Sequence, residues 1–182
     1  MASILKVDTI QTTAGAAQEF GKVLQVVSTY NTDYVSQSIA AHTQVNVTNM
    51  SVTITPSSTS SKILILVNWA GETGSSAWDA TVGLRRGTTQ IGQPQNTSTT
   101  YAGNIGIAGP YGAYQSDNNS TGEFSNFQYL DSPATTSAVT YYMTYGSQTA
   151  QTLKSGGVLS WSGQTTGYER FGYGMMAMEI GQ

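Results

Sequence analysis

The sequence predicts an all-β fold, an antiparallel β-sandwich or jelly roll. About eight to ten short segments have strand character, and turn-forming residues separate them. No stretch shows the sustained 3.6-residue periodicity of an amphipathic helix. Short strands at this spacing, without helices between them, are typical of two packed antiparallel sheets.

The clearest strand signals lie in Ser51–Gly71, the segment around which we expect the domain to be organised. Polar and apolar residues alternate over 51–55, and the next six residues are rich in turn formers. The following strand, Lys62–Val67, contains five consecutive apolar residues. We expect a hairpin here, with both faces of its second strand covered and Leu64 buried.

The remaining strands are expected on both sides of this segment. A turn is expected at Asn31–Asp33, and Gly87–Gln90 has the composition of a hairpin turn. The other strand signals lie around residues 23–27, 39–47, 80–84, 105–107, 124–129, 139–145, 152–154, 158–161 and 175–180.

Composition limits the classes of function. Charged residues make up 9% of the 182 residues, against about 25% in an ordinary soluble domain. The net charge is −3 and there is no basic patch, so we expect no electrostatic binding of nucleic acid. The chain has no cysteine, which excludes disulfides and thiolate metal sites. No apolar run approaches the roughly 18 residues needed to cross a bilayer, so no membrane insertion is expected.

Nothing in the sequence predicts an enzyme. The single histidine, His42, is expected in a strand, and no G-x-S-x-G nucleophile motif is present. The carboxylates form no close D-x-E pair, and Asp117-Asn-Asn119 resembles only a fragment of a calcium loop. We predict no cofactor. A polysaccharide-cleaving enzyme that brings two carboxylates together from distant strands remains a weaker alternative.

The first twenty residues differ from the rest and form a predicted arm, 1–20, ahead of a single domain, 21–182. The arm is either a disordered tail or a docking segment that binds a partner. Its candidate anchoring residues are Leu5, Lys6, Val7, Asp8 and Ile10.

Aromatic residues are the other notable feature. The chain has eleven Tyr and three Trp, most of them in its second half. Such rings suit a core, a subunit interface or a sugar-binding face, since each combines an apolar body with a polar tip. A carbohydrate-binding module with exposed Tyr and Trp is therefore the main alternative function.

Several motifs resemble those of a known group of proteins. The N-terminal Ser3-Ile-Leu-Lys-Val-Asp-Thr-Ile-Gln11 is similar to the first segment of tail-fibre-like virion proteins of marine tailed phages. The body resembles the trimeric jelly rolls of the tumour necrosis factor and complement globular-head type. That resemblance rests on motifs in 51–56, 61–65, 130–133, 139–142 and 178–180. No fibre shaft separates the arm from the domain, which favours a short fibre, knob or capsid decoration.

The resemblance implies a homotrimer on the surface of a phage particle, joined to other virion proteins through the arm. It also leaves open a contact with a host surface glycan or protein. The last strand is then a candidate for the trimer face. Its alternation places Met176, Met178 and Ile180 on one side, which we expect to face the core. On the other side, Tyr173 and Met175 are expected to meet their symmetry mates, with Tyr142 on a neighbouring strand.

Overall fold

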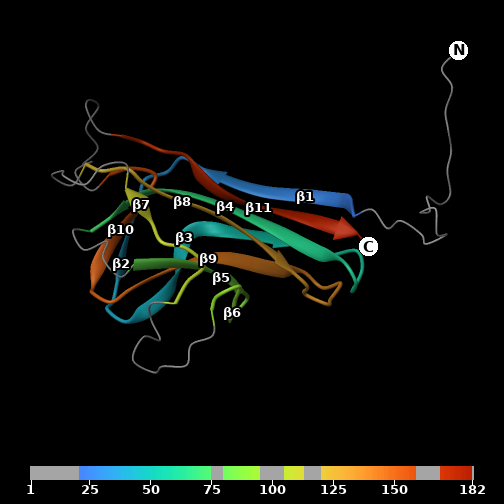
Figure 1. The fold of residues 1–182 in the computed structure, drawn as a ribbon. Helices are drawn as coiled ribbons and strands as arrows, with labels where there is room; N and C mark the ends of the chain where they lie inside the picture. Colours follow the sequence, from blue (N-terminus) through green and yellow to red (C-terminus); the bar gives the residue numbers. More distant parts are fainter. Residues whose placement is uncertain (1–20, 75–79, 95–104, 113–119, 159–168, 182) are drawn as a thin grey trace, which may run out of the picture.

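A computed structural model describes residues 21–74, 80–94, 105–112, 120–158 and 169–181 of the chain. These residues form two stacked antiparallel sheets and contain no helix (Figure 1). The expected all-β sandwich is therefore confirmed. The arm, 1–20, lies outside the described residues.

The larger sheet is built around one long strand. Its members are β1 (Lys22–Asn31), β2 (Val35–Ile39), β4 (Lys62–Thr73), β7 (Tyr111–Gly112), β8 (Glu123–Asp131), β10 (Gln151–Ser155) and β11 (Tyr173–Gly181). One edge of β4 pairs first with β11 and further along with β10, while its other edge pairs with β8. β1 lies outside β11, and β2 lies outside β10.

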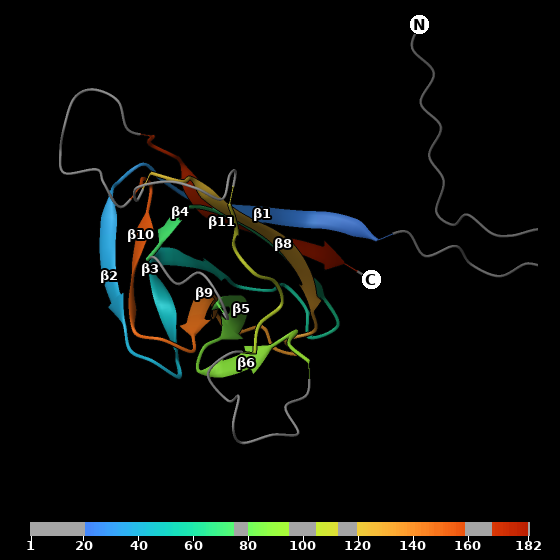
Figure 2. The same ribbon diagram turned by 60° about the vertical axis from the view of Figure 1, so that its left-hand side comes forward.

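The smaller sheet has the order β3 (Thr43–Ile54), β9 (Val139–Ser147), β5 (Ala80–Arg86) and β6 (Thr89–Ile91). Figure 2 shows this sheet as a separate layer below β1, β11 and β8. The hairpin expected at Gly87–Gln90 is confirmed by the pairing of Arg86 with Thr89, and Gly87 has a φ of 58°. A glycine adopts this left-handed conformation at no steric cost.

The core lies between the two sheets. Ile63, Ile65 and Trp69 of β4 are completely buried, as are Tyr141 and Tyr145 of β9. Alternate residues of each strand point inward, as expected for a sandwich. The indole of Trp69 also donates a hydrogen bond of 2.8 Å to the hydroxyl of Ser155, so its polar atom is satisfied within the core.

The segment Ser51–Gly71 is not a hairpin. Its two strands, β3 and β4, belong to different sheets, so the connection between them crosses from one layer to the other. The two faces of β4 also differ, since Leu64 is only half-buried whereas Ile63 and Ile65 have no exposure. The five apolar residues therefore have one face in the core, and the other lies on the outside of the protomer.

One open side of the sandwich is closed by side chains of β1. Their donors satisfy two backbone carbonyls of β3, an edge strand of the smaller sheet, and the carbonyl of Thr55 directly after it. The bonds run from Gln25 to Thr55 (2.7 Å), from Thr29 to Ser51 (2.9 Å) and from Asn31 to Asn49 (2.8 Å).

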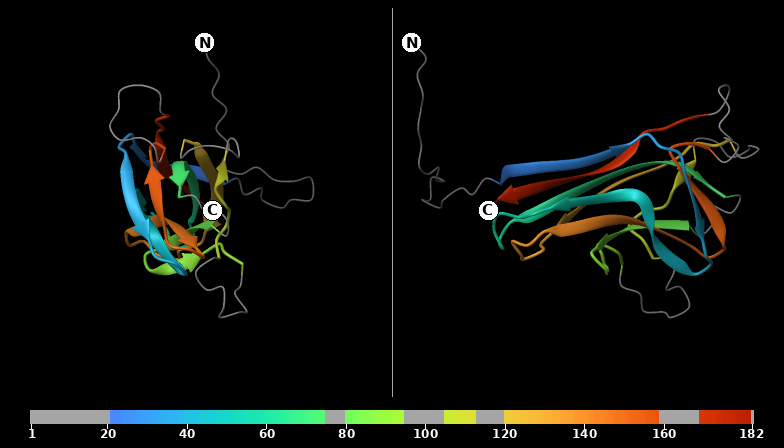
Figure 3. Two further views of the ribbon diagram at one scale, coloured as in Figure 1. Left: turned by 90° about the vertical axis from the view of Figure 1, so that its left-hand side faces the viewer. Right: turned by 180° about the vertical axis from the view of Figure 1, so that it is seen from behind.

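The two ends of the domain differ. The start of β1 pairs with the end of β11, as Lys22 lies opposite Gly181. The arm therefore joins the domain at the end where the last strand finishes, and β2 and β10 lie at the opposite end (Figure 3).

Candidate binding surface

The outer face of the larger sheet is the candidate surface. Strand pairing aligns its outward residues in rows that cross β1, β11, β4 and β8. The rows are Val26, Met178, Leu64 and Leu130; then Ser28, Met176, Leu66 and Gln128; then Tyr30, Gly174, Asn68 and Asn126. Their composition changes from entirely apolar in the first of these rows to mainly polar in the third. A further row nearer the arm contains Val23, Ile180 and Lys62.

The apolar end of this face is exposed in the protomer. Val23, Val26 and Leu130 have exposed fractions of 47%, 51% and 48%. Leu64 and Met178 are half-buried between them. We call these five residues the apolar patch. A cluster of exposed aliphatic side chains on one sheet face is typical of an interaction site.

The polar end contains a hollow of about 690 Å³. Its lining includes Tyr30, Gly174, Asn68 and Asn126 from the third row, and flanking residues of the second row. Gly174 is required here, because a Cβ at this position would collide with the carbonyl oxygen of Thr29. The absence of a side chain at the centre of the row leaves the hollow open.

The expected trimer residues do not lie on this face. Tyr173 and Met175 are buried in the core, with exposed fractions of 0% and 3%, whereas Met176 is exposed. The expected orientation of β11 was wrong, because alternation separates two faces without showing which one meets the other layer. Tyr142 is half-buried on β9, in the smaller sheet, and is no neighbour of β11.

Other candidate residues contribute less. Leu5, Lys6, Val7, Asp8 and Ile10 fall outside the described residues, as does Asp117-Asn-Asn119. His42 is exposed in a turn with a φ of 56°, and not in the expected strand.

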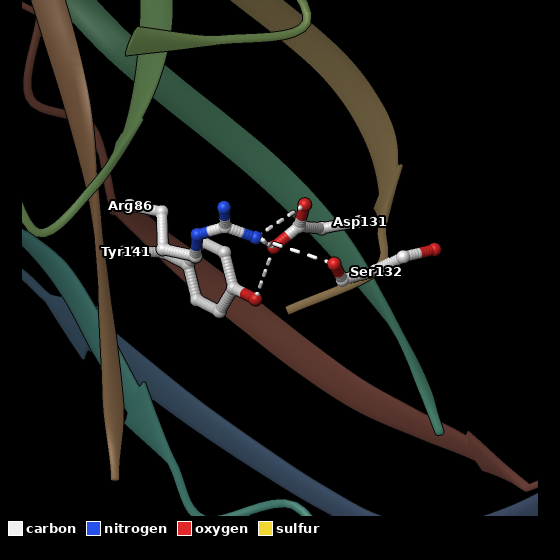
Figure 4. Close-up of polar contacts among 4 residues, drawn as sticks. All are labelled: Arg86, Asp131, Ser132 and Tyr141. Carbon is white, nitrogen blue, oxygen red and sulfur yellow. Dashed lines mark hydrogen bonds and ion pairs between the residues drawn. The ribbon is translucent and has the colours of Figure 1, made fainter. Parts of the chain in front are cut away.

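A buried polar cluster joins the two sheets near the end of β8 (Figure 4). Asp131 has an exposed fraction of 5% and accepts hydrogen bonds from the guanidinium of Arg86 at 2.9 and 3.0 Å. The hydroxyl of Tyr141 donates to the same carboxylate at 2.7 Å. Burial and the Asp131 carboxylate raise the pKa of Tyr141 well above its usual value, so this hydroxyl stays protonated. The cluster therefore links the smaller sheet, through Arg86 and Tyr141, to Asp131 of the larger sheet.

A second buried carboxylate fixes the connection between β3 and β4. Glu179 has no exposure and accepts hydrogen bonds from the backbone and hydroxyl of Ser57 at 2.7 and 2.6 Å, and from Gln25 at 2.6 Å. Burial alone would raise the pKa of Glu179. The hydrogen bonds outweigh burial and lower this pKa to about 2.

Among the residues that the structure places, no three His, Cys, Asp or Glu side chains gather as metal ligands. In the same part of the chain, no helix is long and apolar enough to cross a membrane. The three rows of the outer face offer apolar contact and hydrogen bonding by neutral groups, and Lys62 lies beyond them towards the arm.

Comparison of the chain with protein-family models, with curated proteins and with solved structures finds no match. The function must therefore be argued from the outer face itself. Sequence reasoning missed Val26, Tyr30 and Leu130 on this face. Val26, Ser28 and Tyr30 are every second residue of β1, so the sequence placed them on one face of this strand. It did not show that this face would be the outer one.

Proposed function

We propose that this protein is a structural component of a tailed-phage particle, with an anchoring arm, 1–20, and a jelly-roll head that assembles as a homotrimer. The proposal places the protein on the virion surface as a short fibre, knob or capsid decoration. Other virion proteins would hold the arm, and the heads would be displayed. The head would have a structural role on the particle surface and would catalyse no reaction.

The strand order supports the jelly roll. We leave out the two-residue β7, and also β2 and β10, which extend the larger sheet where β4 no longer pairs with β11, and number the other eight strands in chain order. One sheet then has the order 1-8-3-6 and the other 2-7-4-5. Each sheet thus mixes strands from both halves of the chain, which is the arrangement expected when an eight-stranded ribbon folds into two Greek keys.

The observation that carries self-assembly is the apolar patch. Val26 and Leu130 lie at opposite ends of one row, and both are about half exposed in the protomer. Covering such side chains stabilises an assembly by roughly 25 cal/mol per Å² of apolar surface removed from water. A second copy of the chain supplies apolar surface of the same kind, and self-association usually ends in a closed symmetric assembly.

Two experiments test the proposal. Antibody labelling of intact particles should locate the protein on the virion surface, at the tail, at a vertex or on the capsid face. Deletion of residues 1–20 should leave a folded head that no longer joins particles, while the full-length chain is incorporated. Normal incorporation of the truncated chain would show that the arm is not the anchor, and absence of the protein from purified particles would overturn the structural role.

A further inference from the structure

The polar end of the outer face presents hydrogen-bonding groups that the fold does not use. Asn68, Asn126 and Gln128 are exposed, and their amides make no hydrogen bond within the described residues. Some amides elsewhere on the larger sheet are used within the fold. Those of Gln25 and Gln37, for example, donate to backbone carbonyls at 2.7 and 2.9 Å. The free amides are therefore available to a ligand in the hollow.

The rest of the described lining is mainly apolar or aromatic, with Ser28 and Thr29 as its hydroxyl-bearing residues. Leu66, Met176 and the backbone of Gly174 contribute to the lining from the two central strands. Tyr30 lines the hollow from the β1 edge, with an exposed fraction of 73%, the highest of any large apolar or aromatic side chain that is described. None of the described residues that line the hollow is charged.

We propose that this hollow binds a neutral saccharide. A sugar ring has an apolar C–H face and an edge of hydroxyl groups. The exposed ring of Tyr30 suits the first, while the amides of Asn68 and Asn126 both donate and accept hydrogen bonds and so suit the second. A volume of about 690 Å³ lies within the usual range for small-molecule sites. Because the lining is uncharged, it offers no ion-pair partner to an acidic sugar.

The polar end is a poorer site for a second copy of the chain than the apolar patch. Burial of free amides without matched partners costs about 1–3 kcal/mol for each group. Val26 and Leu130 carry no such cost, so subunit contact is centred on their row and the hollow remains open beside it. This inference builds on the proposed function by naming the ligand class of a host-surface contact. Three hollows on one trimer would also raise the avidity of a weak site.

The test is an array of neutral oligosaccharides, with sialylated and sulfated oligosaccharides printed alongside, probed with the full-length protein. We expect binding to one or more neutral structures. Tyr30→Ala and the double variant Asn68→Ala/Asn126→Ala should each weaken binding of the best neutral oligosaccharide at least about tenfold. Tyr142→Ala, which alters a half-buried tyrosine on the other sheet, is the matched control and should bind as the wild type does.

Light scattering and thermal unfolding of each variant complete the experiment. Unchanged mass and unfolding temperature in the hollow variants, together with lost binding, support the site. Binding to no neutral oligosaccharide, binding only to acidic ones, or equal binding by Tyr30→Ala would overturn it. A change in mass on substitution of Asn68 and Asn126 would assign the hollow to the subunit contact instead. Saccharide binding by a protein that is absent from particles would keep the site and remove the virion role.

Discussion

The hydroxyl of Tyr141 donates a hydrogen bond of 2.7 Å to the carboxylate of Asp131, and this bond crosses from the smaller sheet to the larger one. Arg86, also from the smaller sheet, binds the same carboxylate from another side. The two donors offset part of the desolvation cost of an acid that would otherwise be buried without a partner, and they join the two layers.

Removal of one donor from this cluster should destabilise the domain. Tyr141→Phe keeps the ring in the core and leaves Asp131 with Arg86 as its partner. We expect a loss of about 1–3 kcal/mol in the free energy of unfolding, measured by urea denaturation. Tyr142→Phe is the control, since its side chain is only half-buried. Equal stability of Tyr141→Phe and the wild type would mean that the cluster does not link the sheets energetically.

The two faces of β4 should respond differently to truncation. Ile65→Ala removes a completely buried side chain and should cost about 2–5 kcal/mol. Leu64→Ala alters a half-buried residue on the outer face and should cost less than half as much in an isolated protomer. Denaturant titration of both variants, at a protein concentration where the wild type is monomeric, provides the comparison. Equal losses would indicate that the outer face is covered within the protomer.

Acid should weaken the domain through Glu179. Its pKa is 4.5 in the unfolded chain and about 2 in the folded protein, so the folded state favours the ionised form. The resulting stabilisation, about 3 kcal/mol, is present above pH 4.5 and is lost as the pH falls towards 2. The difference in unfolding free energy between the wild type and Glu179→Gln should therefore shrink over this interval.

The same pair of proteins supplies the control for that experiment. Other carboxylates titrate equally in both, so the difference between the two curves isolates Glu179. A difference that stays constant from pH 5 to pH 2 would contradict the role given to the hydrogen bonds from Ser57 and Gln25.

A charge in the apolar patch should break the trimer without unfolding the head. Val26→Glu places a carboxylate at a site that is 51% exposed in the protomer, so the fold should tolerate it. Burial of this charge in a subunit contact would be costly, and we expect light scattering at micromolar concentration to report a single chain. Thr89→Glu, at an exposed strand position on the smaller sheet, should remain trimeric. If the Val26→Glu variant is still a trimer, the subunit contact lies elsewhere. If the wild type is a monomer, the proposal of a trimer is wrong.

Local sequence signals predicted most strands of this fold, but the strand expected around residues 105–107 was wrong, since they form none. Two-residue alternation indicated strands, and Gly87 indicated a tight turn. The sequence lacks helical periodicity, and the described residues form two sheets and no helix. These signals succeed because the backbone conformation of a strand or turn depends mainly on neighbouring residues.

Only the tertiary structure decided which faces are buried and which residues meet. Alternation in β11 defined two faces, but the packing of the smaller sheet determined that Tyr173 and Met175 point inward and Met176 outward. The crossing from β3 to β4 was likewise set by distant partners, β9 and β11. Arg86 and Asp131 are 45 residues apart, and no local pattern indicates that they form an ion pair. The same long-range pairing aligned Tyr30, Asn68 and Asn126 beside one hollow, because a sheet brings remote segments into register across its strands.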